Sequence, residues 1–197
     1  YRIFLQPSDY NGENPVWKTD SPYYGDYHAI WDTFRATHPF INLIRPTTGG
    51  EMVQSLVDIY ENDKYMPDAR SSHSTGRTQG GSNCDMLVAD AFVKGIRNVD
   101  YEKALDAMIK DATVPPGDDE RQYGRGGLPD YNRLGYVSTD YERGCSRTFE
   151  YSANDYAIAV LAKGLGRTDV YNEYVRKASN WKNLWNPGIS SFGFSGF

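Results

Sequence analysis

The sequence predicts an all-α fold built from three helical hairpins. In each hairpin, one segment is largely apolar and its neighbour along the chain is amphipathic, and prolines and glycines separate the segments. Residues 83–97 and 146–165 leave no polar stripe at helical spacing, so both sides of each helix should contact protein. Their amphipathic partners should face water with one side.

Taken in order, the chain opens with residues 1–22, whose Pro, Gly, Asn and Asp content predicts an irregular arm. Residues 23–38 begin the first helical segment. Residues 48–62 follow the i, i+3, i+4 pattern of an outer helix, as do residues 101–112 and 169–181. The stretch 134–137 is predicted to be an extended connector, and the tail from Asn186 to be loop-like.

Between two predicted helices lies a polar, glycine-rich loop, residues 68–82. It is longer than a helix turn needs, which favours a binding loop over a plain solvated connection. Gly80 and Gly81 could let the backbone approach a ligand closely.

Composition excludes several function classes. The 21 Lys and Arg against 26 Asp and Glu give a net charge of −5, and the basic residues are scattered, which argues against nucleic acid or an anionic membrane as partner. No apolar run reaches the roughly 20 residues of a membrane span. The 16 Tyr and 4 Trp suit sugar stacking, although ordinary packing explains any single ring equally well. Cys84 and Cys145 could pair or remain free thiols.

Three polar side chains stand on the opening turns of the second apolar helix: Glu150, Asn154 and Asp155. A buried carboxylate there needs a metal ion, an arginine or a substrate hydroxyl as its partner. Helical geometry places Glu150 and Asn154 on one face, with Asp155 about 140° away from Glu150.

Four blocks carry a family resemblance. The stretch from Ser146 to Ala159 resembles the signature Ser-x-Thr-Phe/Leu-Glu-Tyr-Ala-x-x-Asp-aromatic-x-Ile-Ala of glycoside hydrolase family 92, the calcium-dependent exo-acting alpha-mannosidases. Residues 31–39, 89–96 and 134–137 resemble three further family blocks in the right order. The resemblance extends from about Tyr23 to Asn186, in a fungal-like variant.

The resemblance implies an architecture. Residues 23–197 would be part of a catalytic domain, about half of an (α/α)6 toroid, without the family's amino-terminal β-sandwich. A half ring would expose the flanks of its apolar helices. We therefore expect the remainder of a larger chain, or a second chain, to complete the toroid.

The resemblance also implies an inverting, Ca²⁺-assisted hydrolysis that releases terminal alpha-linked mannose from glycans. Inversion needs a general acid and a base that activates water from the opposite face. Asp155 matches the family's Asp-aromatic position and is the expected base. Glu150 and Asn154 are the expected metal ligands, with Asn154 standing where relatives often have a second acid. The alternative for Glu150 is an ion pair with Arg147 or another arginine.

The general acid is expected in the glycine-rich loop, where residues 68–84 contain no Glu and Gln79 stands roughly in its place. Because Gln cannot donate a proton, a good leaving group such as a phosphate is favoured, and mannosyl-phosphate caps on N-glycans are a possible substrate. Arg70, His73 and Arg77 are then candidate phosphate partners.

The resemblance places Trp31 and Asp32 toward the sugar. The remaining candidate substrate-binding residues are Arg35, Gly80, Gly81 and Asn83. Packing of Trp31 on Phe34 and an Asp32–Arg35 ion pair are the structural alternative.

Two other functions stay open. The chain could be a non-catalytic carbohydrate-binding or scaffold fragment, or part of a toroid hydrolase of another family. Secretion, or residence in the secretory pathway, is the expected localisation.

Overall fold

The structure is a computed structural model that describes residues 17, 19–27, 29–71, 74–75, 80–117 and 122–196. Its helices are α1 (Ile30–Thr33), α2 (Thr37–Ile44), α3 (Pro46–Asp63), α4 (Cys84–Val93), α5 (Tyr101–Thr113), α6 (Leu128–Leu134), α7 (Gly144–Gly164), α8 (Thr168–Lys177) and the 3₁₀ helix η3 (Asn180–Leu184). Two short antiparallel hairpins pair β1 (Arg70–Ser71) with β2 (Ser74–Thr75) and β3 (Ser190–Ser191) with β4 (Phe194–Ser195). The all-α prediction is confirmed.

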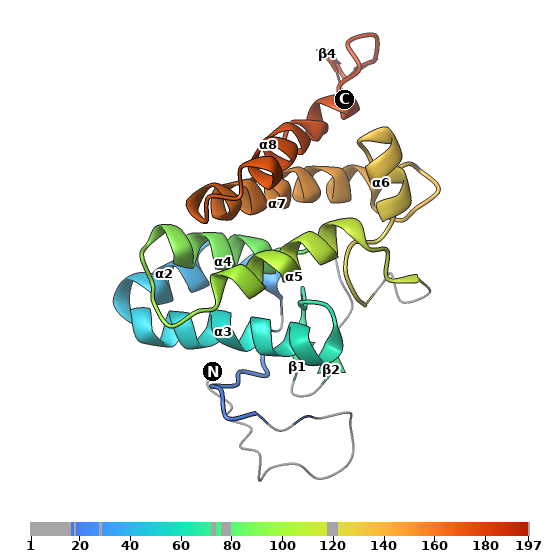
Figure 1. Ribbon diagram of the computed structural model, residues 1–197. Helices are drawn as coiled ribbons and strands as arrows, with labels where there is room; N and C mark the ends of the chain where they lie inside the picture. The colour runs from blue at the N-terminus through green and yellow to red at the C-terminus, as the bar shows by residue number, and fades with distance from the viewer. Residues whose placement is uncertain are drawn as a thin grey trace.

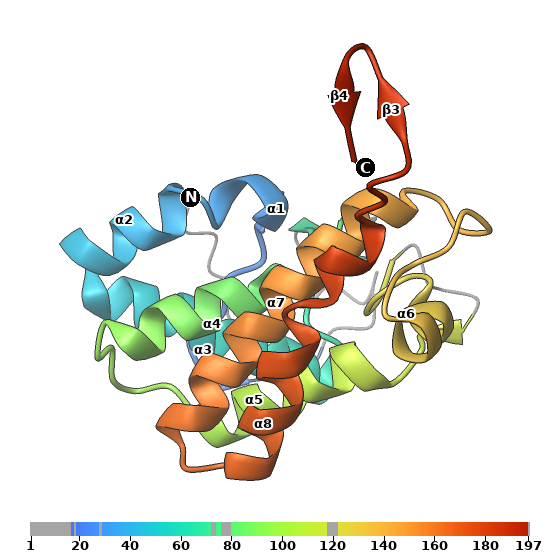
Figure 2. The same cartoon turned by 90° about the horizontal axis from the view of Figure 1, so that it is seen from above.

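The helices stack in three layers (Figure 1). α2 and α3 form the first layer, α4 and α5 the second, and α7 and α8 the third. α4 contacts both α3 and α7, and α7 also contacts α5 and α8. Figure 2 shows α7 crossing over α4 and α5 with α8 at its side. These pairs are the three predicted hairpins, and both helices of the middle layer, α4 and α5, contact α3 on one side and α7 on the other.

The first predicted helical segment, residues 23–38, is broken. Tyr27 forms an antiparallel bridge with Arg70, its N–H donating to the Arg70 carbonyl at 2.9 Å. Its hydroxyl donates to the Met52 carbonyl at 2.6 Å, so the ring is fixed against α3. Burial of this ring outweighs local helix propensity, and the helical residues are split between α1 and α2. Pro46, which has no N–H to donate, separates α2 from α3 as the first residue of the latter.

The described part of the amino-terminal arm, Trp17 and residues 19–22, is irregular as predicted. Trp17 is nevertheless anchored, because its indole N–H donates to Asp58 of α3 at 2.6 Å. Residues 1–16 and 18 lie outside the described residues.

The core is one large apolar cluster shared by all three layers. α4 contributes Leu87 and Val88, and α7 contributes Ile158 and Leu161, each at most 2% exposed. A smaller cluster at the amino-terminal end of α7 joins Leu128, Tyr131, Val137 and Tyr151. This second cluster holds α6 against α7 and frames the polar residues described below.

Three features of the carboxyl-terminal half were not predicted. α6 begins in the stretch after Gly126-Gly127, and the tail contains η3 and the β3–β4 hairpin. Pro129 lies in the first turn of α6, where its missing N–H is tolerated. None of the helices described combines the length and apolarity that a membrane span requires.

Candidate functional site

The amino-terminal ends of α4 and α7 lie together, and the segment Gly80–Gly81 packs between them. A Cβ on Gly81 would lie 2.7 Å from Asn154 Oδ1 and 3.1 Å from the Tyr151 ring. A Cβ on Gly80 would lie 3.0 Å from Glu150 Cγ. The close approach expected of these glycines is therefore made to α7, and any side chain there would push the loop away from the helix.

Arg125 is the centre of a buried polar network between α4, α6 and α7. Its guanidinium donates to Asp155 Oδ1 at 2.6 Å and to Asp85 Oδ2 at 3.3 Å. Its Nε donates to the Ser82 hydroxyl at 2.9 Å. The side chains of Arg125, Asp85 and Asp155 are all 0% exposed. The guanidinium also lies 5.1 Å from the centre of the Tyr151 ring.

Asp155, the expected base, has both oxygens occupied. Arg125 binds one oxygen, and the Tyr131 hydroxyl donates to the other at 2.7 Å. A general base must lie within hydrogen-bonding reach of the water it activates. In the arrangement described, Asp155 instead joins α7 to α6 and to the Arg125 segment, so its packing supports a positioning role and gives no support to a role as base.

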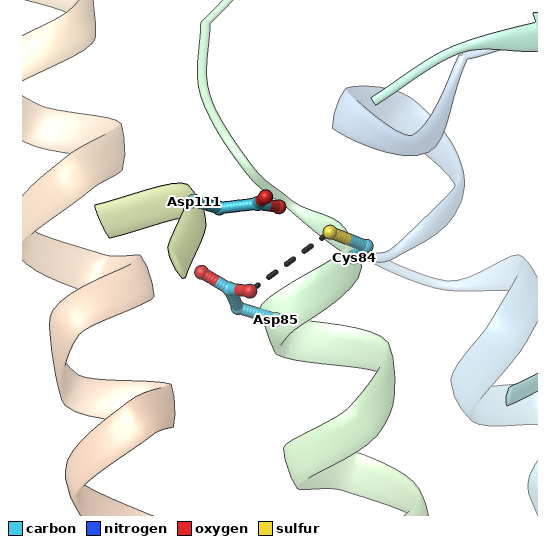
Figure 3. Close-up of side chains that lie close together, drawn as sticks. All are labelled: Cys84, Asp85 and Asp111. Atoms are coloured by element: carbon cyan, nitrogen blue, oxygen red, sulfur yellow. Dashed lines mark hydrogen bonds between the residues drawn. The ribbon is translucent and has the colours of Figure 1, made fainter. Parts of the chain in front are cut away.

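A third buried acid, Asp111 of α5, points toward Asp85 and Cys84 at the start of α4 (Figure 3). It is 0% exposed, and neither carboxyl oxygen has a hydrogen-bond partner among the described residues. Burial raises the pKa of Asp111 well above its ordinary value and the nearby Asp85 raises it further, while Arg125 and the Met66 backbone oppose the rise. Burial likewise raises the pKa of Asp85 to about 7, although Arg125 and Ser82 oppose the shift. One arginine thus serves three buried carboxyl groups, and Asp111 is best accommodated as a neutral acid.

Cys84, Asp85 and Asp111 could also be considered as metal ligands, because a ligand atom of each lies within 4.8 Å of the others. Figure 3 shows the three side chains converging, with the Cys84 thiol donating to Asp85 at 3.9 Å. Two features disfavour a cation here. Arg125 already pairs with Asp85, and Cys84 and Asp85 form the positive amino-terminal turn of α4. Burial raises the pKa of the Cys84 thiol as well, which opposes metal binding as a thiolate.

Glu150, an expected calcium ligand, pairs with Arg35 instead. The Arg35 guanidinium donates to Glu150 Oε1 at 3.1 Å, and the two side chains are 59% and 23% exposed. The alternative of an arginine partner for Glu150 is thus what the structure shows, and the expected Asp32–Arg35 pair is replaced by it. Trp31 is half-buried and Asp32 exposed on the adjacent helix α1.

Asn154 lies one turn after Glu150 on α7 and is 0% exposed. Its amide donates to Asn83 Oδ1 at 3.3 Å, and Asn83 in turn donates to Asp68 at 3.1 Å. Asn154 Oδ1 is buried without a hydrogen-bond partner among the described residues, but the Gly81 backbone covers it. Ca²⁺ takes six to eight oxygen ligands. With Glu150 paired to Arg35 and Asn154 Oδ1 beside Gly81, the contacts described give no support to a calcium site at these two residues.

Arg70, a candidate phosphate partner, is also hydrogen-bonded to residues of the fold. Its buried guanidinium donates to Asp63 at 2.6 Å, to Thr75 at 2.7 Å and to the Tyr23 hydroxyl at 3.1 Å. These contacts join the β1–β2 hairpin to α3 and give no support to substrate binding. His73, Arg77 and Gln79 lie outside the described residues.

The cysteines are free: Cys84 is buried and Cys145 exposed. The possible disulfide is therefore not formed. At the end of α4, Asp90 and Lys94 form an i,i+4 ion pair at 2.7 Å.

Sequence reasoning missed Arg125, Asp85, Tyr131 and Asp111. Their partners lie far along the chain: 30 residues separate Arg125 from Asp155, and 40 separate it from Asp85. Arg125 stands in a glycine-rich segment that has no helical period, so no local signal marked it as buried. The one usable signal was the position of Asp85 at the start of an apolar helix. A carboxylate buried there needs a partner, by the same argument that was applied to Asp155.

Comparison with known proteins shows which family this chain resembles. The family model described as the glycosyl hydrolase family 92 catalytic domain matches residues 1–196. A relative from Arthroderma benhamiae, described as an uncharacterized secreted glycosidase, is 36% identical over 213 residues that cover 100% of this chain and 24% of the relative.

Two solved structures from Bacteroides thetaiotaomicron are similar. An inverting mannosidase of family GH92 has a TM-score of 0.76 and 36% identity, covering 81% of this chain and 22% of that one. A GH92 alpha-mannosidase has a TM-score of 0.80 and 28% identity, covering 94% of this chain and 24% of that one. This chain spans about a quarter of each relative's length. It belongs to glycosyl hydrolase family 92, as part of the family's catalytic domain.

Proposed function

We propose that this chain is part of the catalytic domain of an exo-acting glycosidase that releases terminal alpha-linked mannose with inversion. The observation that carries the proposal is the family match over residues 1–196, together with two similar structures described as mannosidases. Because the chain spans about a quarter of these relatives, the activity is proposed for a complete domain to which this chain contributes three helical layers.

An exposed apolar groove supports the need for further helices. It has a volume of about 330 Å³ and is lined by Phe149, Ser152, Ala153, Tyr156, Ala178 and Trp181. Tyr156 is 57% exposed and Trp181 40%, which is unfavourable for rings facing water. In a toroid, the next hairpin would cover this flank of α7, supplied by a longer chain or by a second chain.

Within the domain, we assign substrate contact to the Glu150–Arg35 pair. It is partly exposed, it faces the Gly80 segment, and its two charged groups can exchange their mutual hydrogen bond for sugar hydroxyls. Trp31 on α1 is the candidate stacking ring beside it. Asp155 is assigned to positioning, because its oxygens are held by Arg125 and Tyr131.

The finer substrate proposal is a mannosyl-phosphate cap. It rests on the sequence alone, where Gln79 stands near the expected place of a general acid and a phosphate leaving group needs no proton. Arg70 no longer supports it, since its guanidinium is paired inside the fold. His73 and Arg77 remain as proposed phosphate partners.

Calcium dependence and secretion are proposed at the level of the whole protein. The family resemblance implies the metal, and no step is assigned to it because the contacts of Glu150 and Asn154 give no support to a site between them. Secretion is supported by the name of the Arthroderma benhamiae relative.

A chimera tests the proposal. This chain should replace the matching segment of the 36%-identical Bacteroides mannosidase, and mannose release should be measured from α-1,2-mannobiose and from a mannosyl phosphodiester. Mannose release by the chimera is the expected result, and Glu150→Gln should weaken mannoside binding where Glu173→Gln on α8 does not. A folded chimera that binds mannosides without releasing mannose favours the non-catalytic alternative. Faster turnover of the mannobiose than of the diester rejects the phosphate proposal alone.

A further inference from the structure

Arg147, in the first turn of α7, carries a buried charge that no acid among the described residues balances. The residue is 3% exposed, and its Nη1 is fully buried without a hydrogen-bond acceptor. Among the described residues, no carboxylate forms an ion pair with it, in contrast to Arg70 and Arg125. An unpaired buried cation is strongly unfavourable, so the fold should hold such a group only where an anion can reach it.

The guanidinium lies flat in a slot on the backbone that precedes α6. A Cβ on Gly126 would lie 2.7 Å from Nη1 and 2.8 Å from both Cζ and Nη2. The same peptide is fixed from its other side, because the Tyr151 hydroxyl donates to the Gly126 carbonyl at 2.8 Å. The slot is thus part of the fixed framework around Tyr151, and only glycine leaves room for the guanidinium.

The surrounding field adds to the positive charge. Arg147 is the fourth residue of α7, a helix of 21 residues whose amino-terminal end carries a partial positive charge. The nearby cation Arg125 is already matched by Asp85 and Asp155. The two acids that bind Arg125 are therefore not shared with Arg147.

We propose that Arg147 is an oxyanion-binding site at the junction of α6 and α7. A planar guanidinium binds carboxylate and phosphate oxygens in pairs, which fits either group. The oxyanion comes from outside this chain: a carboxylate side chain supplied by a further part of the catalytic domain, or a phosphate group on a ligand. The site does not depend on turnover, so it stands apart from the proposed mannosidase activity.

The test uses the 197-residue chain and two probes, sodium acetate and sodium phosphate, each compared with sodium chloride at equal ionic strength. We expect at least one probe to raise the melting temperature by about 2 °C or more, a shift readily resolved for a chain of this size. A response to acetate alone indicates the carboxylate source, and a response to phosphate the ligand source. If neither anion moves the melting temperature, the proposal is overturned.

Variants locate the effect. Arg147→Met, which removes the unpaired charge but keeps the length of the side chain, should lose the anion response and melt no lower than the wild type in sodium chloride. Arg147→Lys should keep a weaker response, and Gly126→Ala, which fills the slot, should lose it. Arg176→Met, at an exposed arginine of α8, should respond like the wild type. An equal anion response in Arg147→Met and the wild type would also overturn the proposal.

Discussion

Arg125 donates a hydrogen bond of 2.6 Å to Asp155, and neither side chain is exposed to solvent. The pair connects the segment before α6 to the middle of α7, and Asp85 extends it to α4 at 3.3 Å. Arg125 and Asp155 have the chemistry of catalytic residues, yet their contacts join the segment before α6 to α7 and α4. The polar surface left for ligands lies about one turn earlier on α7, at Glu150, together with Arg35 from the segment between α1 and α2.

Asp111 should limit stability at neutral and alkaline pH. Burial keeps its carboxyl group protonated in the folded state at pH values where the unfolded chain has lost the proton. The unfolded state then binds fewer protons, so the free energy of unfolding falls as pH rises above the ordinary pKa of 3.8. Asp85, with a pKa raised to about 7, adds to the same fall between about pH 4 and pH 7.

Asp111→Asn should therefore raise the melting temperature at pH 8 and reduce its fall between pH 4 and pH 8. Thermal unfolding over this pH range measures both effects. Asp106→Asn, on the exposed side of the same helix α5, is the control and should keep the wild-type slope. A variant less stable than the wild type at pH 8 would show that Asp111 is charged and paired.

Gly81→Ala should destabilise the fold by about 1–3 kcal/mol, because the added methyl group would meet Asn154 and the Tyr151 ring. Urea unfolding measures the loss. Gly188→Ala is the matched control in the exposed tail, where the nearest atom is an Asn186 side-chain oxygen at 3.2 Å. Equal stability of the two variants would mean that Gly81 does not pack against α7 as described.

Glu150→Gln should change the unfolding free energy by only about 0–1 kcal/mol, because its ion pair with Arg35 is partly exposed. Mannoside binding by the chimera should weaken, as measured by isothermal calorimetry. A large loss of stability with unchanged binding would show that the Glu150–Arg35 pair is structural and would remove it from the proposed pocket.

Millimolar calcium should leave the melting temperature of this chain unchanged. Glu150 is held by Arg35, and the free oxygen of Asn154 is covered by Gly81, so too few oxygens remain for the ion. A calcium-dependent rise that disappears in Glu150→Gln would instead restore the calcium site expected from the sequence.

Periodicity predicted α3, α4, α5 and α7 because each buries a continuous face or both faces, which leaves a repeating apolar pattern. It also predicted α8, although Tyr174 is the residue of that helix that is buried in this chain. It failed at Tyr27, where pairing with Arg70 and burial against α3 override local preference. It could not find the partners of the site residues, because pairs such as Arg35 and Glu150 are 115 residues apart. Asp155 was placed correctly on a buried helix, but α7 begins at Gly144, so Asp155 lies near its middle and not on its opening turns. The identity of its partner depended on tertiary structure alone.

The role of Asp155 is tested most directly by Asp155→Asn, measured by urea unfolding of the chain and by mannose release from the chimera. Loss of the buried ion pair should lower the unfolding free energy by about 3–5 kcal/mol, because Arg125 is left partly uncompensated. A variant that keeps wild-type stability but abolishes mannose release would contradict the positioning role and identify Asp155 as the catalytic base.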